Sequence, residues 1–177
     1  MRRQGIEERL AAWVTLLQAH AVMVDVLERN LEHRAGLPLS SYEVLLRLDM
    51  APAGRLRMLD LSRSLLLSKS GVTRLVDRME EAGLVRRSTS PEDRRVTLVA
   101  VTDTGRRRFR AATPVHLRGI EEHFGRPLGE DVHALRMALR KVLAANGHPD
   151  EACHGPTDFE GVCGTKRRPA PRPARRP

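Results

Sequence analysis

Apolar residues recur at intervals of three and four along the first part of the chain, from residue 6 to about residue 32. This spacing is typical of one face of an amphipathic helix. The apolar stripe consists of Ile6, Leu10, Trp13, Leu17, Val24, Leu27 and Leu31, and His20 falls on the same side. Because so long a stripe exceeds what a small domain needs for its own core, we expect a partner helix from a second subunit to cover part of it.

Three shorter helices are predicted next, over residues 40–50, 58–66 and 68–82. Ser40 and Glu43 are spaced as in a capping box, in which each side chain satisfies a free backbone N–H, and should open the first of these helices. Ser68 is expected to cap the third helix and Gly83 to end it. In that third helix the apolar positions lie on one side, and the other side is short, polar and mostly cationic.

The pattern then changes to two short β-strands, at residues 84–87 and 96–101, joined by a turn at residues 90–93. Four arginines belong to this hairpin: Arg86, Arg87, Arg94 and Arg95. Two short helices followed by a hairpin tipped with arginines is the plan of a winged helix-turn-helix, in which one helix enters the major groove of DNA. The predicted fold class is therefore mainly α with a small β wing.

Two further helices and a tail are predicted after the hairpin. Thr102 should cap a helix that Pro114 kinks or interrupts, and Pro127 should open the last helix. From residue 147 onward the hydrophobic period is lost, and we expect a disordered, basic, Pro-rich tail whose role is solubility or additional non-specific affinity for DNA. Cys153 and Cys163 lie in it; reduced bystander thiols are the expected state, with a disulfide or metal pair as the alternative.

The positive charge is concentrated in the middle of the chain. The formal net charge is +9, and residues 55–110 alone carry 14 basic and 7 acidic residues. Such a cluster is the electrostatic footprint of a polyanion-binding face, although the solvated surface of an Arg-rich protein would have the same composition. Aromatic residues make up only 3% of the chain, which argues against proteins that stack single-stranded bases on aromatic side chains.

Several other classes are excluded on sequence grounds. The chain has neither a Gly-rich phosphate loop nor a nucleophile motif, so we expect no enzyme and no cofactor. His116, His123 and His133 are not spaced to place two imidazoles on one helix face, so no metal site is expected. Neither an apolar run of bilayer length nor a signal peptide is recognised, which predicts a cytoplasmic protein without membrane contact.

Two continuous stretches, residues 68–85 and 90–102, resemble the MarR-type family of bacterial transcription regulators. Asp93-Arg94-Arg95 is similar to the family's Asp-x-Arg wing signature, Val101-Thr102 stands where Leu-Thr is usual, and Met79 replaces a common Leu. The resemblance extends over residues 6–146. It implies an obligate homodimer, with the first helix and the last two interlocked, that binds a pseudo-palindromic double-stranded DNA site.

The resemblance also implies which residues contact DNA. On the helix these are Ser68, Lys69, Ser70, Thr73, Arg74 and Arg78, and on the wing Arg94 and Arg95. Asp93 is expected to orient the wing arginines, because a carboxylate placed beside phosphate is repelled. The implied domains are a dimerisation helix (residues 1–36), the winged helix-turn-helix (37–102), C-terminal dimerisation helices (103–146) and the tail (147–177).

Members of the family usually repress transcription and release DNA when a small molecule binds or a cysteine is oxidised. Because residues 1–146 contain no cysteine, we expect a small-molecule effector. Its candidate contacts, by approximate position, are Trp13, His20, Tyr42 and Arg47. Two other functions are kept as alternatives: an architectural DNA binder without sequence preference, and a dimeric adaptor that does not bind DNA.

Overall fold

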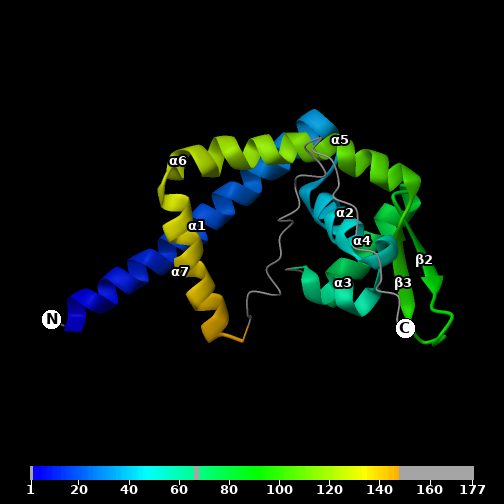
Figure 1. Ribbon diagram of the computed structural model, residues 1–177, viewed down its shortest axis with the longest axis horizontal. Helices are drawn as coiled ribbons and strands as arrows, with labels where there is room; N and C mark the ends of the chain where they lie inside the picture. The colour runs from blue at the N-terminus through cyan, green and yellow to red at the C-terminus, as the bar shows by residue number, and fades with distance from the viewer. Residues whose placement is uncertain (1, 66–67, 148–177) are drawn as a thin grey trace, which may run out of the picture. The chain divides into compact units, whose positions relative to one another are not determined.

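The computed structural model describes residues 2–65 and 68–147 (Figure 1). The elements follow one another as α1 (Arg2–Ala35), α2 (Leu39–Met50), the 3-10 turn η1 (Pro52–Gly54), β1 (Arg55–Arg57), α3 (Met58–Ser64), α4 (Lys69–Glu81), β2 (Val85–Thr89), β3 (Thr97–Val101), α5 (Asp103–Ile120), the π-helical turn η2 (Glu121–Gly125), α6 (Arg126–Leu128) and α7 (Asp131–Ala145). Within the described residues the chain divides into two units, the second of which begins at His133. From residue 148 onward the predicted tail, with both cysteines, lies outside the described residues.

A small antiparallel sheet completes the winged domain. The strand order is β1-β3-β2, with Arg87 opposite Val99 in the β2–β3 hairpin and Leu56 opposite Val99 on the other side. The predicted hairpin and the predicted fold class, mainly α with a β wing, are confirmed. The third strand, β1, was not predicted, because three residues are too short to show a strand period.

Two of the predicted helix caps are present in the structure. The Ser68 hydroxyl accepts a hydrogen bond from the Gly71 N–H at 3.1 Å, and the Thr102 hydroxyl accepts one from the Gly105 N–H at 3.0 Å. Gly83 follows α4 with a φ of 69°, a left-handed conformation that glycine adopts without a steric penalty. These signals define both ends of α4 and the start of α5.

The predicted capping box at Ser40 and Glu43 is wrong. Helix α2 already begins at Leu39, with Pro38 in the capping position and no side-chain cap from its own segment. The Leu39 N–H instead donates to the Glu28 carboxylate of α1, at 3.0 Å. A carboxylate from a packed neighbouring helix thus satisfies a free N–H at the start of α2, and the local side-chain cap that was expected is not formed.

The predicted effects of two prolines also need correction. Helix α5 runs through Pro114 to Ile120, and its buried residues around the proline include Phe109 and Thr113, so tertiary packing maintains the helix despite the missing N–H. The irregularity comes later, as the π-helical turn η2. The last helix does not begin at Pro127: a break at Gly129, with a φ of 52°, separates short α6 from α7.

The hydrophobic core lies where α2, α4, the sheet and α5 meet. Its fully buried residues include Tyr42, Val44, Leu45, Leu48, Leu61, Val72, Val76 and Val99. From α1 only the C-terminal part contributes to this core, through Leu27 and Leu31, where the helix packs along α5. The rest of the predicted apolar stripe is exposed, with Ile6 at 63% and Trp13 at 55% of their full accessibility.

One helix within the described residues, Gly5–Ala35, is long and apolar enough to cross a membrane by length and composition alone. The sequence-based statement that no apolar run approaches bilayer length is therefore too strong. Length and composition do not distinguish a helix that faces lipid from one that is covered by another protein subunit.

Candidate nucleic-acid interface

Helix α4 separates its apolar and polar side chains onto opposite faces. Val72, Leu75, Val76 and Met79 are buried in the core. The opposite, exposed face carries Ser68, Ser70, Thr73, Arg74 and Arg78. The Arg74 Nε donates to the Ser70 carbonyl at 3.4 Å, so this guanidinium lies along the helix surface. Lys69 is the first residue of the helix, and its side chain is outside the described part of the structure.

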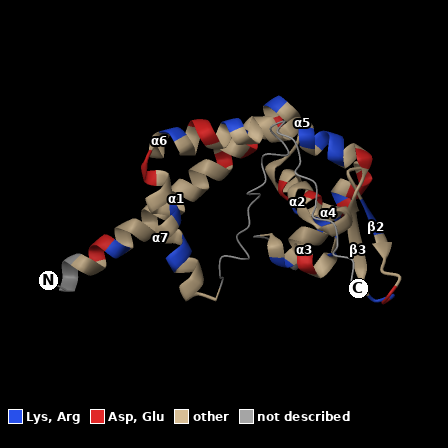
Figure 2. Cartoon of the chain, in the orientation of Figure 1, with Lys and Arg blue, Asp and Glu red and all other residues tan. Residues whose placement is uncertain are grey.

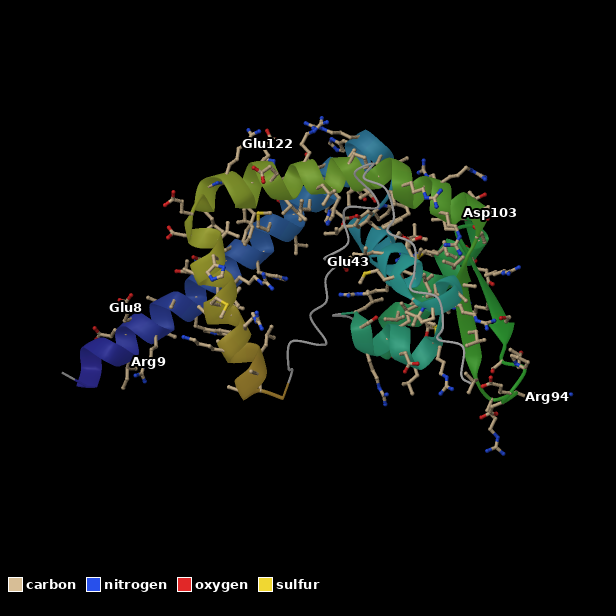
Figure 3. All side chains as sticks on the ribbon, viewed as in Figure 1. Glu8, Arg9, Glu43, Arg94, Asp103 and Glu122 are labelled. Carbon is tan, nitrogen blue, oxygen red and sulfur yellow. The ribbon has the colours of Figure 1, made fainter. Side chains whose placement is uncertain are left out.

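The β2–β3 hairpin places two further arginines in solvent. Arg94 and Arg95 are both exposed in the loop between the strands, and Arg94 lies at the tip of the hairpin in Figure 3. The Asp93 carboxylate accepts the Arg95 backbone N–H at 2.9 Å, and its carbonyl accepts the Val96 N–H at 2.9 Å. Asp93 thus orders the backbone that carries the arginines.

The four hairpin arginines, which the sequence pattern treats alike, have different roles. Arg86 is exposed, whereas the side chain of Arg87 turns toward α4 and pairs with Asp77 at 2.5 Å and Glu80 at 3.2 Å. This difference follows from the alternation of side chains along a strand. No sequence signal identified Asp77 and Glu80 as its partners.

Figure 2 marks the Lys and Arg residues along the chain; some of them pair with other parts of the protein, and others are exposed. On α5, Arg106 pairs with Asp49 at 3.5 Å, and Arg108 donates to the Gly36 carbonyl at 2.5 Å. Arg55 and Arg57 of β1 are exposed, as is Arg63 of α3. These three arginines were not singled out from the sequence, although they lie within the basic segment that the charge count identified.

Among the candidate effector contacts, Tyr42 is a core residue. Its side chain is fully buried, and its hydroxyl donates to the Thr113 hydroxyl oxygen at 3.4 Å. Its ring packs against His116 at 4.4 Å and Phe109 at 5.2 Å between ring centroids. Burial raises the pKa of the Tyr42 hydroxyl, and the Thr113 hydrogen bond partly offsets this.

The other three candidates lie on the surfaces of α1 and α2. Trp13 and His20 are exposed on α1, and Arg47 is half-buried on α2. Loss of surrounding water raises the pKa of the Glu43 carboxyl, which is labelled in Figure 3. The nearby Arg47 and His20 oppose this rise of the pKa, and Glu28 adds to it. Glu43 therefore belongs to this polar group, although the sequence had suggested a capping role for it.

Comparisons with known proteins agree with this geometry. A model of the MarR family matches residues 35–96, from the end of α1 to the wing loop. The chain is 27% identical over 136 residues to the HTH-type transcriptional regulator MhqR of Bacillus subtilis (strain 168), covering 77% of this chain and 92% of MhqR.

Two solved structures from Streptomyces coelicolor are similar over most of their length. AbsC, a MarR family transcriptional regulator, has a TM-score of 0.72 and 32% identity, covering 78% of this chain and 93% of AbsC. Sco3205, a MarR family transcriptional regulator crystallised in complex with DNA, has a TM-score of 0.72 and 28% identity, covering 81% of this chain and 94% of that protein.

Proposed function

The chain belongs to the MarR family of transcriptional regulators, which are not enzymes, and from this premise we propose that it is a homodimeric repressor released from its operator by a small molecule. The observation that carries the proposal is the pairing of one polar, cationic face on α4 with a wing that presents two exposed arginines. A helix and a wing of this kind suit simultaneous contact with base edges and phosphates.

In the proposed complex α4 lies in the major groove. Its DNA contacts are Ser68, Lys69, Ser70, Thr73, Arg74 and Arg78. Arg94 and Arg95 reach the minor groove or the backbone, where a cationic side chain is attracted to phosphate. Asp93 contributes by ordering the wing loop through the Arg95 N–H.

A homodimer accounts for the apolar side chains that the described chain leaves exposed. Most of them belong to residues 6–24 of α1, including Leu10 and Leu17, and to α7, where Val142 is 56% exposed. We assign dimerisation to residues 1–36 and 103–146, and DNA binding to residues 37–102. A two-fold dimer of this kind requires a pseudo-palindromic operator with half-sites about one helical turn of DNA apart.

The proposed location is the cytoplasm, and the proposed effector site is on the α1–α2 side of the winged domain. Charged residues such as Asp25 and Arg29 on α1 disfavour a lipid environment for that helix. An effector bound there would contact the Arg47 guanidinium, the His20 imidazole and the Trp13 indole. Tyr42 lies on the same helix as Arg47 and is buried in the core.

The test is a fluorescence-anisotropy titration of the full chain onto labelled DNA from upstream of its own gene. A shuffled duplex of equal length is the control, and both are measured at low and at near-physiological salt. Because phosphate contacts weaken steeply with salt while base contacts discriminate between sequences, the comparison separates the two kinds of binding.

Preference for the upstream duplex that persists at the higher salt supports the proposal. Equal binding to both duplexes that disappears at the higher salt favours an architectural DNA binder. Failure to bind either duplex at low salt favours the adaptor. Analytical ultracentrifugation of the free protein tests the homodimer independently.

A further inference from the structure

We infer that Arg87 is a positioning residue that fixes the wing against helix α4, so that both elements engage one DNA site together. Its partners are Thr73, Asp77 and Glu80, and these four residues are called the wing clamp. This inference rests on the proposed function. It assigns a role to residues that the proposed DNA contacts leave unexplained, above all the two carboxylates.

The wing clamp joins one residue of β2 to two turns of α4. The Arg87 Nη1 donates to Asp77 Oδ1 at 2.5 Å and to Glu80 Oε2 at 3.2 Å, and its Nη2 donates to the Thr73 carbonyl at 3.2 Å. The backbone N–H of Arg87 also donates to Glu80 Oε1, at 2.6 Å. Thr73, Asp77 and Glu80 are four and three residues apart, so they share one face of the helix.

The charges of the wing clamp argue against a direct DNA contact by Arg87. Two carboxylates neutralise its guanidinium, and the side chain is only 24% exposed, whereas those of Asp77 and Glu80 are 47% and 38% exposed. Carboxylates near phosphates weaken DNA binding by repulsion. The presence of the two carboxylates on a DNA-facing helix is explained if they hold the wing in position.

The location of the wing clamp suits this role. Arg87 sits in the middle of β2, opposite Val99, while Arg94 and Arg95 lie beyond the end of that strand. A rotation of the hairpin at Arg87 therefore produces a larger displacement at its tip. Hydrogen bonds weaken steeply with misalignment, so the wing arginines need a defined orientation to bind while α4 is in the groove.

In the decisive experiment, a purely electrostatic role and a positioning role predict changes of opposite sign in the affinity for the upstream duplex. The double variant Asp77→Asn/Glu80→Gln removes two negative charges from the DNA-binding domain, so a purely electrostatic role predicts tighter binding to every duplex. The wing clamp predicts weaker binding to the upstream duplex and unchanged or tighter binding to the shuffled one. We expect the ratio of the two affinities to fall about tenfold, comparable to the loss of one specific contact.

Glu81→Gln is the matched control, because Glu81 is exposed on the same helix and is not part of the wing clamp. It removes a negative charge and should leave the affinity ratio unchanged. Thermal melting by circular dichroism establishes that each variant folds. If the double variant does not fold, Asp77→Asn alone is used, since Glu80 still holds the Arg87 backbone N–H.

Two further measurements distinguish positioning from general stabilisation. Arg87→Lys, which can pair with one carboxylate at a time, should recover part of the affinity ratio lost in Arg87→Gln. Arg95→Ala should weaken binding less in the Asp77→Asn/Glu80→Gln background than in the native chain, because a misplaced wing has less contact to lose.

The inference would be overturned if the folded double variant had the same affinity ratio as Glu81→Gln. It would also be overturned if Arg95→Ala weakened binding equally in the double variant and in the native chain. Failure of the proposed function has a different signature. In that case the native chain itself does not prefer its upstream duplex, whereas failure of the wing clamp leaves that preference present in the native chain and unchanged in the double variant.

Discussion

Replacement of Gly105 by alanine tests the packing between the start of α5 and the base of the wing. Gly105 is buried in the first turn of α5, where its N–H donates to the capping Thr102 hydroxyl. A Cβ at this position would lie 2.1 Å from the Leu84 carbonyl oxygen and 3.0 Å from Val101 Cγ2. The oxygen belongs to the backbone, and it also accepts the Thr102 N–H at 3.1 Å.

The magnitude follows from how far the backbone must move. A carbon–oxygen contact is normally about 3.3 Å, so the start of α5 and the Leu84 peptide would have to separate by about 1 Å. Overpacking of this kind costs about 1–3 kcal/mol. The better helix propensity of alanine offsets at most about 1 kcal/mol of this. We expect Gly105→Ala to lower the free energy of unfolding by about 1–2 kcal/mol.

Urea unfolding followed by circular dichroism, at one fixed protein concentration, measures this difference. Gly5→Ala is the control, because a Cβ there has nothing within 4 Å and lies in helix α1. The same substitution should be neutral or stabilising by up to about 1 kcal/mol at that position. A Gly105→Ala protein as stable as the native chain would refute the argument that the backbone contact with Leu84 excludes a side chain.

Three other predictions concern binding, capping and pH. Arg74→Ala should weaken binding to the upstream duplex by about 1–3 kcal/mol in the anisotropy assay if it contacts a base edge, whereas an equal loss on the shuffled duplex would make it a phosphate contact. Glu28→Ala should lower the free energy of unfolding by about 1 kcal/mol, since it uncaps the Leu39 N–H, while Glu28→Gln keeps an acceptor oxygen and should lose less. Burial lowers the pKa of His116 to about 4 from 6.5, and its Nδ1 has no partner among the described residues. The contribution of His116 to stability should therefore be fully present above pH 6.5 and fall by at most about 3 kcal/mol as the pH drops toward 4, because the imidazole of the unfolded chain binds a proton first. His116→Phe should flatten this dependence in urea unfolding at a series of pH values.

Signals contained within a few neighbouring residues were sufficient for much of the winged domain. Ser68 and Thr102 cap helices through N–H groups three residues away, and Gly83 ends α4 by its own conformation. Such interactions form wherever the local backbone becomes helical, whatever packs around it. The sequence also predicted the apolar face of α4, its cationic opposite face and the arginine-tipped hairpin, because the periodicity of side chains along a helix or strand is a property of the chain itself.

Only the tertiary structure decided interactions between segments that are distant along the chain. Glu28 from α1 caps α2 in place of a local box, Arg87 reaches across to α4 while Arg86 faces solvent, and Tyr42 is buried against α5. Each outcome depends on which helix or strand arrives beside the residue, and the chain pattern does not specify that neighbour. Packing thus determined which charged groups are neutralised and which remain free, and with them the composition of the candidate DNA-binding surface.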